Sequence, residues 1–435
     1  MNMVRYSLNE QLRGVVCSVP HSGFIRWCKS IPGRSGEFVF CSVCITLMGC
    51  TIQNDREDVD LDGDSFSQGR MDSRPDPDTG LTKKRNEGMA TRTSPRHLSE
   101  GRPVYASGGD PSKCNDGAYG VDYWGVGTGK DNTWTAASPA WCAMDLGDTS
   151  AKEVMVVLSD ESGTGNIEGH PGFRRYTIET SANSTDGENG SWNEQISVKK
   201  NVFGYRMHRL AFTAQRWVKV TVLAPATAVL DELDVWDVSD APDDMPDSII
   251  WVGDSITARC SDRHGTFGAK PSLQQFIHHA TATRYPLQMG AGTVNISTSE
   301  MLNGNPSQID TLLAVYPDIH IWGLALGTND SAGHIQSDEF ESNLTALIDK
   351  IEAAGHLAVP ARIPCPASHI HSRVIARLNA VIDHITEKRN LVPGPDLYNL
   401  FNTHAGIYYD RDSIHPNSVG CTAWQLAWAN ILLAE

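Results

Sequence analysis

The sequence predicts two folded domains of different classes: a β-sandwich, and after it an α/β domain whose parallel sheet is covered by helices on both faces. Between residues 102 and 238, short strand-like runs follow one another with turn residues between them and no helical period. Between residues 248 and 435, strand-like and helix-like runs alternate. A connector rich in Asp and Pro, residues 239–247, separates these two patterns.

In the first domain, strands are predicted at residues 154–158, 176–180 and 217–222, where β-branched and aromatic side chains are bounded by Gly, Asn, Asp and Ser. Consecutive strands without helices between them are typical of a β-sandwich. In the second domain, strands are predicted at 249–252, 319–326 and 356–363 and helices at 338–354, 373–387 and 418–433. This alternation predicts a parallel sheet with its functional residues at the carboxyl ends of the strands.

The beginning of the chain differs from both domains. Residues 38–48 are an apolar run that follows Arg26, Lys29 and Arg34, and Cys50 comes soon after it. Eleven residues are too few to span a bilayer but suit a signal peptide. The run resembles a bacterial lipobox, in which Cys50 is lipidated, so residues 1–50 are interpreted as a leader. The alternative is a short buried strand in an N-terminal extension.

Residues 51–101 are polar and charged without an apolar period, which predicts a disordered linker. Its stretch 58–64 begins like a calcium loop, but Gly69 stands where the bidentate Glu is needed, so no metal is predicted there. The chain carries a formal net charge of -16, which argues against nucleic-acid binding and against a polybasic membrane surface. We therefore expect contact with a membrane only through a lipid anchor.

Five cysteines lie beyond the leader: Cys114, Cys142, Cys260, Cys365 and Cys421. An exported protein can hold disulfides, and Cys114 with Cys142 is the expected pair because both lie in the small first domain. The odd number leaves at least one thiol unpaired within the domains. Cys260, five residues beyond Ser255, is expected to serve packing rather than catalysis.

The prediction of catalytic chemistry rests on a serine and a histidine. Ser255 follows the apolar run 249–252 through Gly253, which places its hydroxyl at the carboxyl edge of the sheet. His415 lies three residues after Asp412 on a late loop. Ester cleavage needs a nucleophile, a base that takes its proton and a group that orients the base. We therefore predict Ser255 as the nucleophile, His415 as the base and Asp412 as the orienting carboxylate.

Four blocks in this order resemble the SGNH (GDSL-type) hydrolases, and the resemblance covers residues 248–435: Gly253-Asp254-Ser255, Gly290-Ala291-Gly292-Thr293, Gly327-Thr328-Asn329-Asp330 and Asp412-x-x-His415. It implies a flavodoxin-like, three-layer α/β fold and a serine mechanism without a metal or organic cofactor. It also implies an oxyanion hole made by the backbone N–H of Ser255, the backbone N–H of Gly292 and the side-chain amide of Asn329. The Asn that usually opens the second block is absent, so Gly290 is the alternative donor to Gly292.

The first domain resembles the discoidin or galactose-binding-like jelly roll through its motifs at residues 115–117, 123–124, 139–141, 144–147, 217–222 and 230–236. Members of that family often bind sugars through aromatic side chains on loops, because an aromatic ring stacks on the apolar face of a sugar. The candidates here are Trp124, Trp134 and Trp192. For each of them the alternative is a structural role in the core of a small β-domain.

Together these features predict an exported bacterial serine esterase, either a lipoprotein of the cell envelope or a secreted protein, that removes acyl groups from carbohydrate. O-acetyl esters are the expected substrates. One alternative is a general carboxylesterase or lysophospholipase, which needs a longer apolar groove for its acyl chain. The other is a carbohydrate-binding protein without catalysis, although such a protein has no need of Ser255, Asn329, Asp412 and His415 together. The sequence leaves the oligomeric state open.

Overall fold

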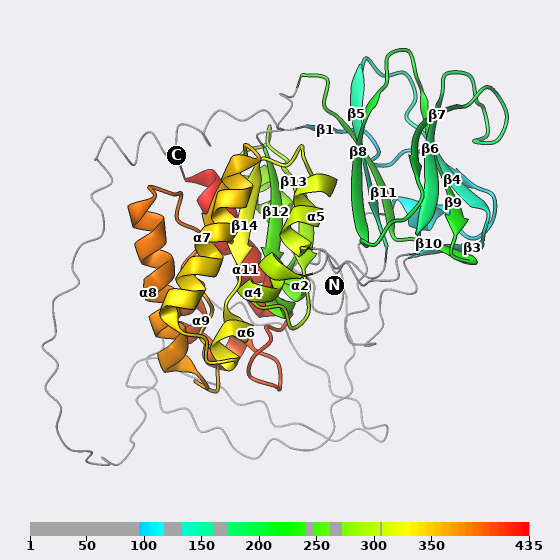
Figure 1. Ribbon diagram of the computed structural model, residues 1–435. Coiled ribbons are helices and arrows are strands. Elements are labelled where there is room, and N and C mark those ends of the chain that lie inside the picture. Colours follow the sequence, from blue (N-terminus) through cyan, green and yellow to red (C-terminus); the bar gives the residue numbers. More distant parts are fainter. Residues whose placement is uncertain are drawn as a thin grey trace, which may run out of the picture. The chain divides into compact units, whose positions relative to one another are not determined.

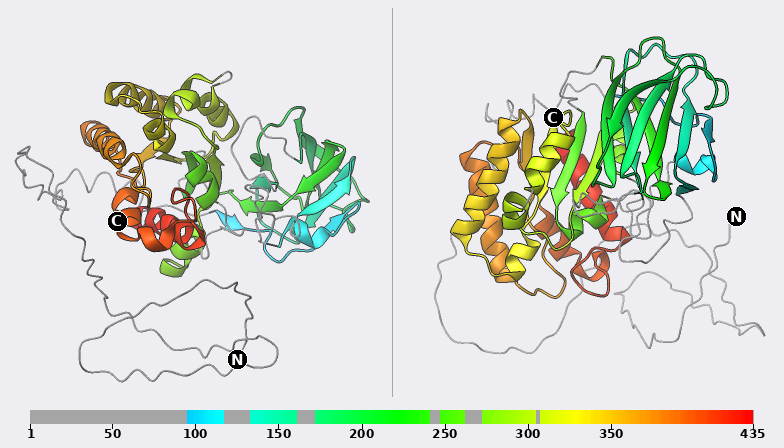
Figure 2. Two further views of the ribbon diagram at one scale, coloured as in Figure 1. Left: turned by 90° about the horizontal axis from the view of Figure 1, so that it is seen from below. Right: turned by 45° about the vertical axis from the view of Figure 1, so that its right-hand side comes forward.

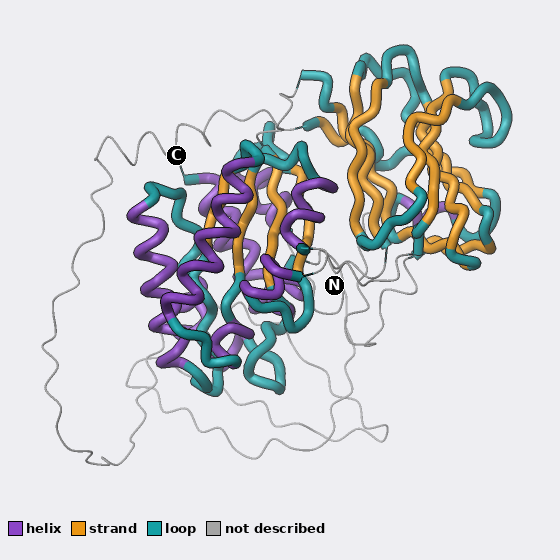
Figure 3. The backbone as a smooth tube through the Cα atoms, in the orientation of Figure 1, coloured by secondary structure: helices purple, strands orange, loops and turns teal. Residues whose placement is uncertain are grey.

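The computed structural model describes residues 95–116, 133–160, 172–240, 247–261, 272–304 and 307–434. Within these ranges, an all-strand region is followed by a region in which strands and helices alternate (Figures 1 and 3). Both parts of the predicted fold class are therefore confirmed. The predicted leader with Cys50, most of the predicted linker, and Trp124 lie outside the described residues.

The first region is built from antiparallel sheets. A four-stranded sheet has the order β1-β11-β5-β8, with β1 at Arg96–His97, β5 at Glu153–Ser159, β8 at Tyr205–Ala211 and β11 at Glu232–Asp237. A five-stranded sheet has the order β2-β4-β9-β6-β7, with β2 at Val104–Ala106, β4 at Ala140–Asp145, β6 at Arg175–Ser181, β7 at Asn193–Val198 and β9 at Trp217–Ala224. A separate pair joins β3 at Trp134–Ala137 to β10 at Thr227–Leu230.

Alternate residues of the two larger sheets fill one buried core. On β5 these are Val154, Val156 and Leu158, and on β9 they are Val218, Val220 and Val222. Because side chains point to opposite faces along a strand, these alternate residues all lie on the face of each sheet that points into the sandwich core. The core of the sandwich is thus built from strands that the sequence predicted at residues 154–158 and 217–222.

Two details of the sandwich bear on the sequence predictions. The predicted boundary at residue 102 is too late, because β1 pairs with β11 through Arg96 opposite Asp237 and His97 opposite Trp236. A strand of two residues is too short to produce a recognisable period. The expected disulfide between Cys114 and Cys142 is present, and it joins the short 3-10 helix η1, Pro111–Cys114, to β4.

The second region contains a parallel sheet in the order β13-β12-β14-β15. Its strands are β12 at Ser248–Gly253, β13 at Leu287–Gly292, β14 at Ile321–Ala325 and β15 at Leu357–Pro360. This order, second-first-third-fourth along the chain, is that of flavodoxin-like sheets. The helices are α2 at Ser255–Cys260, α3 at Leu273–Ala280, α4 at Thr298–Asn303, α5 at Gln308–Val315, α6 at Thr328–Ala332, α7 at Ser337–Ala353, α8 at Ser372–Lys388, α9 at Leu397–Thr403, α10 at Ala405–Tyr408 and α11 at Ser418–Leu433.

Helices cover both faces of this sheet, which gives three layers (Figure 2). On one face, Ile250 and Val252 of β12 share a core with apolar residues of α4, α5, α7 and α8. On the other face, Ile249 and Trp251 pack with residues of α2, α3, α9 and α11. Because both faces of β12 are buried, the strand reads as a continuous apolar run in the sequence.

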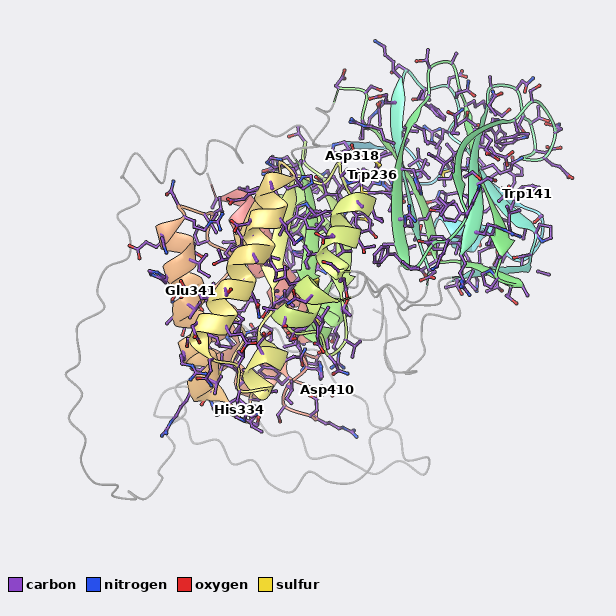
Figure 4. The ribbon with its side chains drawn as sticks, viewed as in Figure 1. Trp141, Trp236, Asp318, His334, Glu341 and Asp410 are labelled. Atoms are coloured by element: carbon purple, nitrogen blue, oxygen red, sulfur yellow. A yellow bond between two sulfur atoms is a disulfide. The ribbon has the colours of Figure 1, made fainter. Side chains whose placement is uncertain are left out.

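The carboxyl ends of the parallel strands meet at one edge of the α/β region. Figure 4 shows Asp410 and His334 at this end and Asp318, which precedes β14, at the opposite end. Gly253, Gly292 and Ala325 are the last residues of β12, β13 and β14. The segments that carry the predicted site residues therefore leave the sheet side by side. None of the helices in the described ranges is long and apolar enough to cross a membrane.

Candidate active site

Ser255 is the first residue of α2 and follows β12 after a tight turn. The Asp254 side chain caps the helix by accepting a hydrogen bond from Ile256 N at 2.9 Å. The turn requires glycine at position 253, since a Cβ there would overlap the Thr257 side chain and lie 2.5 Å from Ala325 O. Ser255 itself is 7% exposed, so its hydroxyl is held in a largely dry setting.

His415 brings the predicted base to this hydroxyl. Its Nε2 lies 2.9 Å from Ser255 Oγ, and its Nδ1 lies 2.7 Å from Asp412 Oδ2. The other carboxylate oxygen of Asp412 accepts hydrogen bonds from Ile414 N at 3.0 Å and from His415 N at 2.9 Å. Partial burial opposes the charge of Asp412, but these backbone N–H groups and the His415 ring hold its pKa below the usual value. The carboxylate is thus ionised and fixed where it can orient the imidazole.

Asn329, the predicted side-chain donor of the oxyanion hole, lies on α6 directly beyond the end of β14. Its Nδ2 donates a hydrogen bond to Ile296 O at 2.9 Å. The next residue, Asp330, accepts hydrogen bonds from Thr298 N at 3.1 Å and from Thr298 Oγ1 at 2.5 Å. Burial raises the pKa of Asp330, and the Thr298 hydrogen bonds oppose that rise. This network fixes the Asn329 turn against the start of α4.

The two predicted glycine donors lie within β13. Gly292 pairs with Gly253 at the end of the sheet that carries Ser255. Gly290 pairs with Trp251, two residues further from that end. A Cβ on Gly292 would overlap the backbone of Ala258 in α2. Close packing of β13 against α2 is therefore a sufficient reason for glycine at position 292. Its role as an oxyanion donor stays a prediction.

The loop after β13 contacts both sides of the site. Val294 packs against Ala258 of α2, and Ile296 accepts the hydrogen bond from Asn329 described above. Between them, exposed Asn295 adopts φ 62°, a left-handed conformation that Asn tolerates better than most residues. Sequence reasoning overlooked this loop because a single Asn carries no motif.

The family comparison covers all of these groups. Residues 251–423 match the model of the GDSL-like Lipase/Acylhydrolase family, and this span includes Ser255, Gly292, Asn329, Asp412 and His415. This part of the chain is a GDSL-like lipase/acylhydrolase domain. The protein is accordingly an ester hydrolase. A search of curated proteins finds no match.

Several solved structures are similar to parts of the chain. The acetylxylan esterase Axe2 of Geobacillus stearothermophilus has 17% sequence identity and a TM-score of 0.35, and the match covers 43% of this chain and 95% of Axe2. Chitosan-binding module 2 of a Paenibacillus chitosanase/glucanase has 21% identity and a TM-score of 0.25, over 32% of this chain and 98% of the module. The Bacillus subtilis protein YxiM has 16% identity and a TM-score of 0.40, over 76% and 98%.

Two further connections link helix α2, which begins with Ser255, to the segment of the GDSL-like domain that carries His415 and to the helix that follows it. Arg259 of α2 donates to Asp410 at 2.8 Å, and Asp410 N in turn donates to His415 O at 2.8 Å. A disulfide joins Cys260 at the end of α2 to Cys421 in α11. Cys260 thus forms a disulfide, whereas the sequence predicted only a packing role for it. Neither connection is visible in the sequence, because the partners are far apart and belong to no shared motif.

The carboxyl group of Asp254, next to Ser255, has a strongly perturbed pKa. Complete burial raises its pKa to about 6, although the hydrogen bond from Ile256 N opposes the rise. Its place at the N-cap of α2 suits a residue that orders the turn next to Ser255. Within the ranges that the structure describes, no group of three or more His, Cys, Asp or Glu side chains is placed to hold a metal ion.

The tryptophans predicted to bind sugar have different surroundings. Trp134 is fully buried, and its indole N–H donates to Gly108 O at 2.7 Å, so its position contradicts a role in stacking on a ligand. Trp192 is half-buried, and Lys219 Nζ lies 3.7 Å from the centre of its ring. Trp124 lies outside the described residues. Composition cannot separate these cases, because an aromatic residue on a strand suits either face of the sheet.

Proposed function

We propose that the chain is an exported serine esterase that removes O-acetyl groups from carbohydrate. The observation that carries the proposal is the continuous hydrogen-bonded series from Asp412 through His415 to Ser255, with spacings of 2.7 and 2.9 Å. A nucleophile, a base and an orienting group at these distances suit acyl transfer. The GDSL-like family match independently supports ester hydrolysis.

In the first half of the reaction, Ser255 Oγ attacks the ester carbonyl carbon while His415 Nε2 takes the hydroxyl proton. Asp412, ionised and bonded to Nδ1, stabilises the imidazolium that forms. The tetrahedral intermediate then collapses, the bond to the sugar oxygen breaks, and His415 returns the proton to the departing alkoxide. The products of this half are a free sugar hydroxyl and an acetylated Ser255.

Water completes the cycle by the same route. His415 takes a proton from water as the oxygen attacks the acyl carbon, and it returns that proton to Ser255 Oγ as acetate leaves. Both tetrahedral intermediates carry an oxyanion. The Ser255 N–H at the start of α2, the Asn329 amide and a backbone N–H of the segment 290–295 are the proposed donors. One such donor typically contributes about 3–4 kcal/mol to transition-state stabilisation.

Support for a carbohydrate substrate comes from the β-sandwich that precedes the GDSL-like domain. Its half-buried aromatic side chains, Tyr105, Trp141 and Trp192, provide surfaces on which a sugar ring can stack. Export is supported by the two disulfides, Cys114–Cys142 and Cys260–Cys421, since such bonds persist mainly outside the reducing cytosol. The apolar run before Cys50 is consistent with export through a cleaved or lipidated leader.

Esters with longer acyl chains are the second candidate substrates, and exposed apolar residues favour them. Ile407, 60% exposed, and Val419, 52% exposed, flank the segment that carries Asp412 and His415. The two ends of this segment lie close together, because Asn417 Nδ2 donates a hydrogen bond to Ile407 O at 2.7 Å. Apolar side chains at such positions can contact an acyl chain.

Acetate release from a panel of acetylated polysaccharides, compared with hydrolysis of p-nitrophenyl acetate and octanoate, tests the proposal. We expect acetate to be the better acyl group and at least one polysaccharide to be deacetylated, with Ser255→Ala inactive on all of them. Faster hydrolysis of octanoate would favour the second candidate. If no acetylated polysaccharide releases acetate while p-nitrophenyl acetate is cleaved, the carbohydrate part of the proposal is wrong.

A further inference from the structure

The sandwich domain carries a groove on the outer face of its five-stranded sheet, remote in sequence from the catalytic residues. The groove has a volume of about 430 Å³. Its walls combine two aromatic residues, two carboxylates, a serine and a few small apolar residues: Tyr105, Trp141, Asp186, Glu188, Ser107, Val104, Ala106 and Pro111. Figure 4 shows the position of Trp141 on the sandwich. A groove of this size can hold one or two sugar rings.

A glycine brings the carboxylates to the aromatic residues. Gly187, between Asp186 and Glu188, has φ 82°, and a Cβ there would lie 3.1 Å from the Trp141 ring and from Tyr105 Cβ. Glycine therefore permits both the left-handed turn and the close approach to the sheet. As a result, the loop between β6 and β7 places two acidic side chains beside an aromatic surface.

Hydrogen bonds hold this loop in one conformation. Asp186 Oδ1 accepts from Glu188 N at 2.9 Å and from Asn189 N at 2.8 Å, and these bonds lower the pKa of Asp186. The Trp192 indole donates to Asn189 O at 2.9 Å, and Lys219 covers a face of that ring. Trp192 thus supports the loop from beneath. A fixed loop binds more tightly than a flexible one, because less conformational entropy is lost on binding.

We propose that this groove binds an oligosaccharide of amino sugars whose nitrogen atoms are protonated. The rings of Trp141 and Tyr105 can stack on the apolar face of a sugar, while Asp186 and Glu188 accept hydrogen bonds from an ammonium group. Among the described residues that line the groove there is no Lys or Arg to neutralise these carboxylates. Lys219 lies 3.6 Å from Glu179 and over Trp192, and it also interacts electrostatically with Glu188, but it does not line the groove. The charge of the groove therefore suits a cationic rather than an acidic or neutral saccharide.

This inference deepens the proposed function and rests on it, since it names the class of polymer to which the esterase would be held. Binding a polymer through a second site raises the effective concentration of its ester groups at the enzyme. Small soluble esters gain nothing from such a site. The groove should therefore affect reactions on polymers and leave hydrolysis of p-nitrophenyl acetate unchanged.

Calorimetric titration of the full chain carrying Ser255→Ala tests the proposal, with a trimer of glucosamine and a trimer of N-acetylglucosamine as the two ligands. The titration uses a pH at which the free amines are protonated. We expect the cationic trimer to bind and the neutral trimer to bind at least about tenfold more weakly, since hydrogen bonds to a charged group are stronger than those between neutral groups. Asp186→Asn together with Glu188→Gln should weaken binding of the cationic trimer by a similar factor.

The matched control is Glu194→Gln, which removes an exposed carboxylate on β7 that does not line the groove. It should leave binding unchanged. Equal affinity for the two trimers, or unchanged binding by the Asp186/Glu188 variant, would overturn the proposal. If the parent enzyme fails to cleave acetyl esters while its Ser255→Ala form binds the cationic trimer, the proposed function fails and the groove assignment stands. If acetyl esters are cleaved and neither trimer binds, only the groove assignment fails.

Discussion

The candidate active site and the sandwich groove differ in how closely the type of a residue is tied to its role. At the catalytic site, Ser255, Asp412 and His415 can act together only at set distances, and their place at strand ends and on one late loop provides those distances. In the sandwich, aromatic residues of the same kind fill the core, as Trp134 does, or line a surface groove, as Trp141 does. Chemistry that requires a fixed geometry therefore leaves a clearer pattern in a sequence than recognition by a surface.

Removal of the base should have the largest effect. His415→Ala leaves Ser255 without a proton acceptor 2.9 Å away, so kcat for p-nitrophenyl acetate should fall by about 10⁴-fold or more. The control is His404→Ala, a half-buried histidine whose Nδ1 contacts Leu400 O. A loss of less than tenfold in His415→Ala would show that this imidazole is not the base.

Substitution of two tryptophans of the sandwich should lower the stability of the protein by clearly different amounts. Trp134→Ala empties a fully buried site and removes the hydrogen bond to Gly108 O, so the free energy of unfolding should fall by about 3–5 kcal/mol. Trp192→Ala should cost less, because that ring is only half-buried. Denaturant unfolding followed by circular dichroism measures both. Equal losses would mean that Trp192 also belongs to the core.

Loss of the Asn329 amide should slow catalysis with little change in substrate affinity. Asn329→Ala removes one oxyanion donor, and kcat should fall by about 10²–10³-fold. Asn303→Ala, which changes an exposed Asn at the end of α4, is the matched control and should stay at the parent rate. A rise in KM with unchanged kcat would instead assign Asn329 to ground-state binding.

Burial of Asp254 should produce a smaller effect that depends on pH. Because its pKa is raised from 3.8 to about 6, the folded state binds more protons than the unfolded state between these values, and this group lowers stability as pH rises through that window. Asp254→Asn keeps a cap acceptor for Ile256 N but carries no charge. Its advantage in unfolding free energy should approach about 3 kcal/mol above pH 6 and vanish below about pH 4. Urea unfolding at pH 4 and pH 7.5 measures the difference, and an equal advantage at both pH values would contradict it.

The sequence was sufficient to predict the parallel sheet and its covering helices. It also singled out Ser255, Asp412 and His415, which the structure brings within hydrogen-bond distance of one another, while their catalytic roles stay predictions. Ser255 and Asn329 follow apolar strands, and the chain order of such strands determines which edge of the sheet they share. The sequence did not predict the ion pair between Arg259 and Asp410, because contacts between residues that are distant along the chain depend on packing rather than on local pattern. The two-residue strand β1 was missed for lack of any period. The groove at Trp141 requires knowledge of which side of a strand faces solvent.

Labelling with a fluorophosphonate probe, followed by mass spectrometry of the modified peptide, tests the catalytic assignment most directly. The reagent forms a stable bond only with a serine that a neighbouring base activates. We predict one modified residue, Ser255, in the parent enzyme, and labelling slowed by several orders of magnitude in His415→Ala. Modification of another serine, or none at all in the folded parent enzyme, would contradict the assignment.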